Sequence, residues 1–212
     1  YSQVIREIEK ISARNGVALA ETAKVYTRLV PAMESFKLQF KGIKDYSQAA
    51  LKITNAFSSS LKISNSATQE AGSAMLQFSQ AMQSGKLAGD EFRAITEAAP
   101  ALLNAIAEGS GYARSELKAM SSEGKLTTEF ISNALLKVEE DLQNKVSKIP
   151  LSLGQSFENL VSKIMIASGE VNKATGIIDG MVKVIEQAGV TVDSFSKVVT
   201  EYSKPISKMN DE

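Results

Sequence analysis

The sequence predicts an all-α protein: a compact multi-helix bundle of short helices, followed by longer helices towards the C-terminus. Three observations lead to this prediction. Apolar residues recur at spacings of three and four along most of the chain, as they do on one face of a helix. No stretch alternates convincingly between apolar and polar residues at the period of a half-buried strand. The 4 prolines and 13 glycines fall mainly between the periodic segments, where they separate helices.

Two helices are predicted near the N-terminus. The apolar residues of the first are Val4, Ile5, Ile8 and Ile11. Asn15 and Gly16 are expected to end this helix. The apolar residues of the second are Val25, Leu29, Met33 and Phe36. Because Pro31 lies inside the second pattern and has no backbone N–H, we expect a kink or a break there.

The next two predicted helices each have a start signal. The first carries Tyr46, Ala50, Ile53 and Phe57 on one side. The Asp45 carboxylate just before it can accept hydrogen bonds from the free N–H groups of the first turn. The apolar residues of the second are Ala71, Ala74, Met75, Phe78 and Met82. Residues Ser66 to Gln69 have the pattern of a capping box, and Gly85 is expected to end the helix in a left-handed conformation.

Short helices and turns are predicted in the middle of the chain. Gly89 and Asp90 start one helix, whose inward residues are Phe92 and Ile95. Pro100 ends it and starts another, whose apolar residues are Leu102, Leu103 and Ile106. We expect Gly109, Ser110 and Gly111 to form a flexible turn. A further short helix is anchored by Leu117 and Met120, and a left-handed Gly124 is expected to end it.

The longest predicted helix is capped by Thr127 and stopped by Pro150. Its apolar positions approach the spacing of a coiled-coil seam: Ile131, Leu135, Val138, Leu142, Val146 and Ile149. Such a stripe is usually buried in the protein's own core, which is the favoured interpretation. The alternative is a contact between copies of the chain. Three more helices are predicted after Pro150, closing near Gly169, Gly189 and Pro205.

The composition argues against several kinds of function. The chain has no cysteine and no histidine, which removes disulfides, Cys/His zinc sites and Ser-His-Asp triads. Lysine plus arginine, 24 residues, balance aspartate plus glutamate, 24 residues, and no basic run attracts nucleic acid. No apolar run approaches the roughly 18 residues of a membrane span. We expect no cofactor, no metal, no signal peptide and no membrane span in this sequence, which is interpreted as a piece of a longer protein.

Two motif types that suggest catalysis or phosphate binding are incomplete. Ser115–Lys118 and Ser122–Lys125 match S-x-x-K, but the S-D-N and K-T-G elements of serine acylases are missing. A phosphate-binding loop needs a glycine five residues before its Gly-Lys pair, where this chain has Gln80 and Ala119. Both motifs are therefore interpreted as chance matches.

Adjacent carboxylates occur twice, and both sets have a structural interpretation. Asp90 and Glu91 lie near a predicted helix start, where acidic side chains complement the helix dipole. Glu139, Glu140 and Asp141 fall within the longest predicted helix and are expected to form a solvated face. A glycoside hydrolase places two carboxylates on opposite sides of a bond, and nothing in this pattern indicates that arrangement.

An ordered set of sequence blocks resembles the tape measure proteins of phage tails. The first block runs from Gln80 to Arg93, the next is Ala98–Pro100, and the third joins Leu117 to Glu123–Thr127. Pro150–Gln155 resembles the element that closes the family's domain. The residues carrying the resemblance are Ser84, Gly85, Lys86, Leu87, Gly89, Asp90, Glu91, Phe92, Arg93, Pro100, Gly124, Lys125, Leu126, Pro150 and Gly154.

The resemblance implies a division of the chain. Residues 1–42 are an N-terminal helical approach segment, 43–165 the tape measure globular domain, and 166–212 a helical extension. The likeness fades beyond Gly169. Phe78–Ser79 departs from the leucine-serine usual in the family, a change that a core position tolerates. The motif residues are expected to serve the fold rather than chemistry.

The resemblance also implies a structural, non-enzymatic function in a phage or a prophage. Tape measure proteins are long helical chains inside the tail tube, and their length sets how many rings of tube subunit are stacked. The implied partners are other copies of the chain, the tail tube protein, the tail assembly chaperone and the tail tip proteins. The implied location is the host cytoplasm during assembly and the tail interior in the virion. Alternatives are a bacterial helical adaptor or coiled-coil interaction module and a cell-wall lytic domain.

Overall fold

The computed structural model describes residues 2–40, 42–43, 45–152, 156 and 159. Contacts along the chain divide it into two units, residues 1–159 and 160–212. The description that follows concerns the first unit. Gly154 and the helices predicted after Pro150 lie outside the described residues, apart from Ser156 and Asn159.

The described part of the chain is built from eight α-helices and contains no strand, which confirms the all-α prediction. Only two isolated antiparallel bridges occur in it, Phe40–Ile43 and Lys86–Thr127. The helices are α1 (Ser2–Asn15), α2 (Leu19–Ser35), α3 (Tyr46–Ile63), α4 (Thr68–Ser84), α5 (Gly89–Ala98), α6 (Pro100–Ser110), α7 (Arg114–Ser122) and α8 (Thr128–Ser147).

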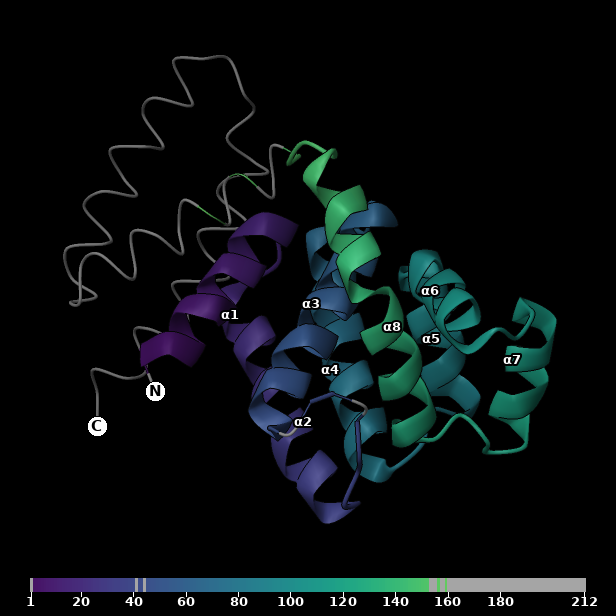
Figure 1. The fold of residues 1–212 in the computed structure, drawn as a ribbon. Coiled ribbons are helices and arrows are strands. Elements are labelled where there is room, and N and C mark those ends of the chain that lie inside the picture. The colour runs from purple at the N-terminus through teal and green to yellow at the C-terminus, as the bar shows by residue number, and fades with distance from the viewer. Residues whose placement is uncertain (1, 41, 44, 153–155, 157–158, 160–212) are drawn as a thin grey trace, which may run out of the picture. The chain divides into compact units, whose positions relative to one another are not determined.

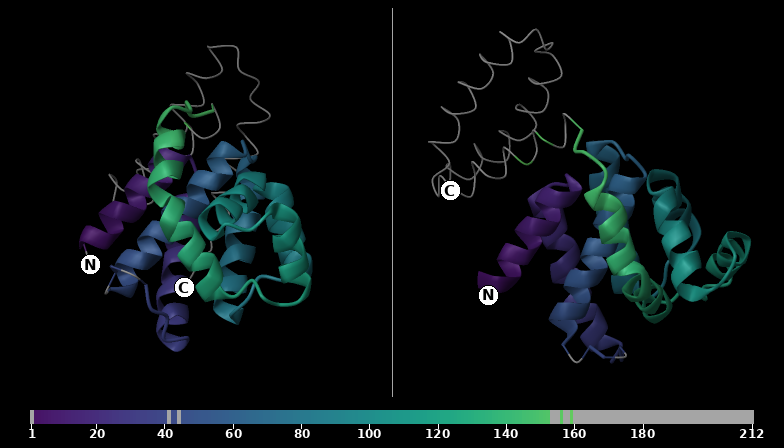
Figure 2. Two further views of the ribbon diagram at one scale, coloured as in Figure 1. Left: turned by 45° about the vertical axis from the view of Figure 1, so that its right-hand side comes forward. Right: turned by 45° about the horizontal axis from the view of Figure 1, so that its top comes forward.

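Helices α3 and α8 form the centre of this unit. They pack against each other, α6 packs against α8, and α2 packs against α4 (Figure 1). Helices α1 and α7 lie at opposite edges of the unit (Figure 2). Because α1 and α2 both contact α3, residues 2–35 belong to the same compact unit as the helices that follow. The division at residues 42 and 165 stays a prediction.

The core confirms the intramolecular interpretation of the long apolar stripe. Ile131, Leu135 and Val146 of α8 are fully buried, and Val138 and Leu142 are nearly so. Across the core, the rings of Phe57 and Phe78 stack with their centroids 4.1 Å apart. The stripe of α8 is thus buried within the chain's own core.

Most predicted helix ends are confirmed, because they depend on local chemistry. The Asp45 carboxylate accepts a hydrogen bond from Ser47 N, and the Thr127 hydroxyl accepts one from Phe130 N. Gly85 follows α4 with φ 95° and Gly124 follows α7 with φ 68°, both left-handed. Pro100 occupies the first position of α6, where its missing N–H costs nothing.

The predicted break in α2 does not occur, and one of its predicted core residues is exposed. The helix runs through Pro31, which lies on its exposed side. Phe36 does not join the buried stripe. It follows the end of α2 and is 42% exposed.

The predicted capping box and the predicted flexible turn are also wrong. Helix α4 starts at Thr68 without a side-chain cap, because the Ser66 hydroxyl bonds instead to the carbonyls of Leu61 and Ala98. Gly109 and Ser110 are the last turn of α6, and the left-handed Gly111 follows them. At Ser66 the local pattern is overruled by a partner that is distant in the sequence, the Ala98 carbonyl.

Candidate functional site

Two of the resemblance blocks meet in space although they lie far apart in the sequence. Residues Ser84–Leu87 begin at the last residue of α4, and residues Glu123–Thr127 precede α8. The Leu87 backbone N–H donates to the Leu126 carbonyl at 2.8 Å, and the Thr128 N–H donates to the Gly85 carbonyl at 2.9 Å. We call this pair of segments the motif clasp.

Buried side chains on the core side stabilise the motif clasp. Leu87 and Leu126 are both buried in the main core. The Thr128 hydroxyl donates to the Met82 carbonyl at 2.7 Å, which satisfies a backbone group in the last turn of α4. The Ser121 hydroxyl, also buried, reaches the Leu87 carbonyl at 3.4 Å. The clasp therefore joins the end of α4, the end of α7 and the start of α8.

The two glycines of the motif clasp are required by its backbone. A side chain at either φ value would be strained, since L-residues rarely adopt this region. At Gly85 there is also a steric reason, because an added Cβ would lie 3.0 Å from the Phe36 ring. That contact gives the exposed Phe36 a role: its ring covers the backbone of the clasp.

The two lysines of the motif clasp point outward. Lys86 and Lys125 are exposed, and Lys125 pairs with Glu123 at 2.6 Å. The hydrogen bond and the charge of Glu123 raise the pKa of Lys125 above its ordinary value. An exposed ammonium group that is paired with a carboxylate lacks the lowered pKa of an activated lysine amine.

The remaining resemblance residues serve the starts and ends of helices. Asp90 and Glu91 are exposed in the first turn of α5, and Asp90 pairs with Arg93 at 3.3 Å. Phe92 points into the core. Pro150 is exposed after α8. These residues contact the fold around them and do not converge on one site.

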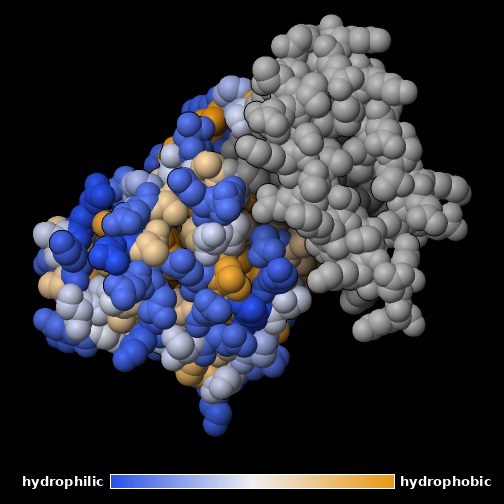
Figure 3. All heavy atoms as spheres, turned by 180° about the vertical axis from the view of Figure 1, so that it is seen from behind, coloured by the Kyte–Doolittle hydropathy of each residue, from blue (hydrophilic) through white to orange (hydrophobic). Residues whose placement is uncertain are grey.

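No metal-binding arrangement is found among the described residues. They hold no group of three acidic, histidine or cysteine side chains placed to bind a metal ion. A groove of about 560 Å³ between α1 and α3 is lined by neither loop of the clasp. On the face that Figure 3 shows, apolar side chains are scattered among polar ones. No helix in the described part is both long and apolar enough to cross a membrane.

A comparison with known protein families tests the resemblance to tape measure proteins. A sequence model of the tape measure protein family matches residues 1–173, more than half of the chain. The chain belongs to the tape measure protein family. The match includes the motif clasp and all eight described helices. No curated protein and no solved structure matches the sequence.

Two structural features of this tape measure domain were missed from the sequence. Gly109 lets α6 approach α8 so closely that an added Cβ would lie 2.0 Å from the Ala134 carbonyl oxygen. Glu139, predicted to face solvent, is 7% exposed and accepts a hydrogen bond from Asn55 of α3. The alanines and small residues around Gly109 were a usable signal for close helix packing, whereas no local signal marks Glu139.

Proposed function

We propose that this domain is the folded part of a phage or prophage tail tape measure protein that sets tail length and templates assembly of the tail tube. The observation that carries the proposal is the family match over residues 1–173. The motif clasp adds to it, because two of the family-like blocks build one structural element.

The geometry favours a folded anchor over the ruler itself. A helix rises about 1.5 Å per residue, so a ruler encodes length best as an extended helix. The longest helix described here, α8, has 20 residues and would span only about 30 Å. The other helices fold back on each other. We therefore assign length measurement to extended helical segments of such a protein and assembly to this domain.

The proposed partners are those of tail assembly. They are other copies of the chain, the tail tube protein, the tail assembly chaperone and the tail tip proteins. The zero net charge suits contacts with proteins better than contacts with a phosphate backbone. The proposed location is the host cytoplasm during assembly and the tail interior afterwards.

The test separates tail number from tail length. In a phage that carries this gene, Thr128→Val together with Gly85→Val should weaken the clasp and reduce the number of tails seen by electron microscopy, without changing their length. Deleting 20 residues from an extended helical segment should instead shorten the tails by about 30 Å. Normal tails after removal of the whole domain would refute the proposal.

We also propose that the domain is not an enzyme. The exposed, paired Lys125 and the dispersed carboxylates support this proposal. The purified chain should release no soluble fragments from peptidoglycan. Release that survives purification would instead favour the cell-wall lytic interpretation.

A further inference from the structure

Helix α1 is attached to the domain differently from the other helices. The main apolar cluster takes residues from each of α2 to α8 and, among the described residues, none from α1. Ile8 and Ile11 are buried but lie outside that cluster. Apolar burial within the main core therefore holds α2 to α8 together more firmly than it holds α1.

Buried polar side chains lie where the C-terminal end of α1 meets α3, and their hydrogen bonds continue from α3 to α8. The Asn15 amide donates to the Asn55 side-chain oxygen at 3.3 Å, and the Ser59 hydroxyl donates to the Asn15 oxygen at 3.2 Å. Asn55 in turn donates to the Glu139 carboxylate, whose other oxygen faces Lys52 at 3.5 Å. Asn15 is 0% and Asn55 5% exposed. We call these five residues the polar seam.

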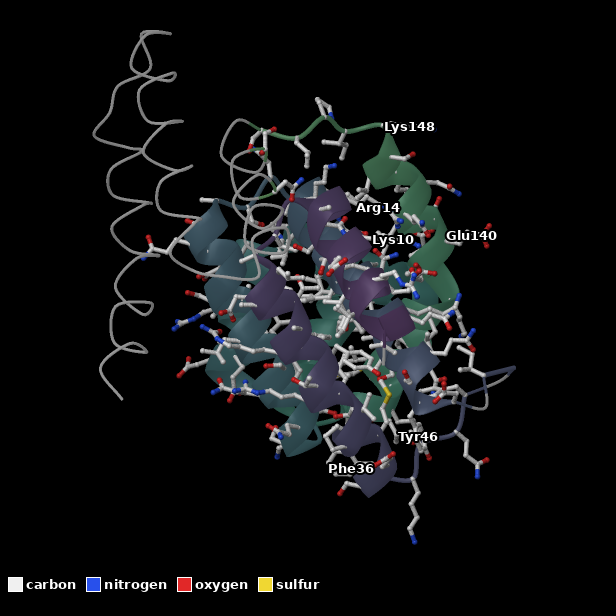
Figure 4. All side chains as sticks on the ribbon, turned by 90° about the vertical axis from the view of Figure 1, so that its left-hand side faces the viewer. Lys10, Arg14, Phe36, Tyr46, Glu140 and Lys148 are labelled. Atoms are coloured by element: carbon white, nitrogen blue, oxygen red, sulfur yellow. The ribbon has the colours of Figure 1, made fainter. Side chains whose placement is uncertain are left out.

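Further hydrogen bonds hold the C-terminal end of α1 through its backbone. Lys62 Nζ donates to the Arg14 carbonyl at 2.8 Å, and Asn159 Nδ2 donates to the Ala13 carbonyl at 2.6 Å. Figure 4 labels Lys10 and Arg14 on α1, Glu140 on α8 and Lys148 directly after α8. Polar groups thus make most of the specific contacts at this end of the helix.

Opening the polar seam costs little free energy, for two physical reasons. Water replaces each lost hydrogen bond, so the net contribution of a protein hydrogen bond is much smaller than its gross strength. The surface uncovered on α3 would carry Asn55 and Ser59, which are readily hydrated, and Asn55 would keep its hydrogen bond to Glu139 of α8. Gly16, with φ 65°, forms the bend that separates α1 from α2.

We infer that α1 is a releasable helix, which separates from the domain as a unit along the polar seam while α2 to α8 stay folded. The motion would free the chain at Asn159 at the same time, because Asn159 is hydrogen-bonded to α1. This inference does not depend on the proposed tail function.

Hydrogen exchange of the full 212-residue chain, measured by mass spectrometry, tests the inference. Amides in the second half of α1 should exchange at least tenfold faster than those in the middle of α3 and α8. Combining Asn15→Leu, Asn55→Leu and Glu139→Leu replaces the seam by apolar contacts and should bring the α1 rate close to that of α3.

The matched control is Thr54→Val with Ser132→Ala. It removes two buried hydroxyls of α3 and α8 that have no hydrogen-bond partner among the described residues. This control should leave the ratio of α1 to α3 exchange rates unchanged. If the triple variant does not fold, Asn15→Ala replaces it and should accelerate exchange in α1 alone, about tenfold. Equal rates in α1 and α3 of the unsubstituted chain, or equal acceleration of all helices by Asn15→Ala, would overturn the inference.

Discussion

Gly109→Ala is expected to destabilise the domain, although alanine is the better helix former. Gly109 lies in the last turn of α6 and is buried against α8. An added Cβ would meet the Ala134 carbonyl oxygen at 2.0 Å and its carbonyl carbon at 2.7 Å. Both are backbone atoms of α8, so no side-chain rotation can relieve the contact.

The size of the effect follows from the distance. An ordinary contact begins at 3.4 Å, so the two helices must separate locally by the difference, about 1.4 Å. Overpacking of a core costs about 1–3 kcal/mol, and a rigid backbone neighbour places this case at the upper end. Helix propensity returns at most about 1 kcal/mol. The net loss in the free energy of unfolding is therefore about 2 kcal/mol.

Urea denaturation followed by circular dichroism measures this loss. With a slope of about 2 kcal/mol/M, the unfolding midpoint should fall by about 1 M. The matched control is Gly72→Ala in α4, where no atom lies within 4 Å of the added Cβ. It should raise the midpoint slightly, because only the propensity gain remains. If both alanines shift the midpoint upward, the close approach of α6 and α8 is refuted.

Three further changes test other contacts. Gly85→Val should cost about 1–2 kcal/mol, from a left-handed φ and a 3.0 Å approach to the Phe36 ring; a melting curve unchanged from the parent chain would contradict this reading. Thr127→Ala should cost about 1 kcal/mol through loss of the α8 cap, measured by urea unfolding, and Thr127→Ser should retain most of the stability. Burial, and then the charge of Arg14, lower the pKa of Lys62. The unfolded chain therefore binds the Lys62 proton more tightly, so stability should rise as the pH increases towards 10.5. Lys62→Met should lack this rise in the urea midpoint between pH 8 and 10.5, and parallel curves for both chains would argue against it.

Helix positions were predictable where the deciding chemistry is local. Asp45 and Thr127 cap their helices with side chains that reach two or three residues along the chain, a distance that sequence spacing encodes. Ser66 has the same kind of hydroxyl, but its partner is the carbonyl of Ala98. Only the folded chain brings that carbonyl within reach. Capping side chains thus gave right and wrong predictions according to the sequence distance of their partners.

Glycines also gave both right and wrong predictions, but for a different reason. Gly85 and Gly124 end helices by adopting positive φ, which their positions after apolar stripes indicate. Gly109 has an ordinary helical backbone and is needed only because Ala134 is so near. Flexibility and close approach both favour the smallest residue. The glycine in the sequence does not show which of these two roles it has. That depends on which helices pack together.

The candidate site was predictable as a set of residues but not as an arrangement. The blocks around Gly85 and Gly124 were identified separately, each as a loop after a helix. Their backbone pairing through Leu87 and Leu126 requires α5, α6 and α7 to fold back across the intervening chain. No single block contains that information. The buried position of Glu139 was unpredictable for a similar reason, since its partner Asn55 lies on another helix.

The energetics of the motif clasp explain why its leucines matter as much as its glycines. Closing a loop of about 40 residues between Leu87 and Leu126 costs about 3 kcal/mol of chain entropy. The three hydrogen bonds that join the ends of α4 and α8 contribute about 1 kcal/mol each, which only balances that cost. Burial of the two leucines adds about 1.5–3 kcal/mol each and decides that the clasp stays closed. In each segment a left-handed glycine and an exposed lysine precede a buried leucine, which is the pattern of a loop pair held closed by its leucines. For this reason we interpret these two family-like blocks as structure rather than chemistry.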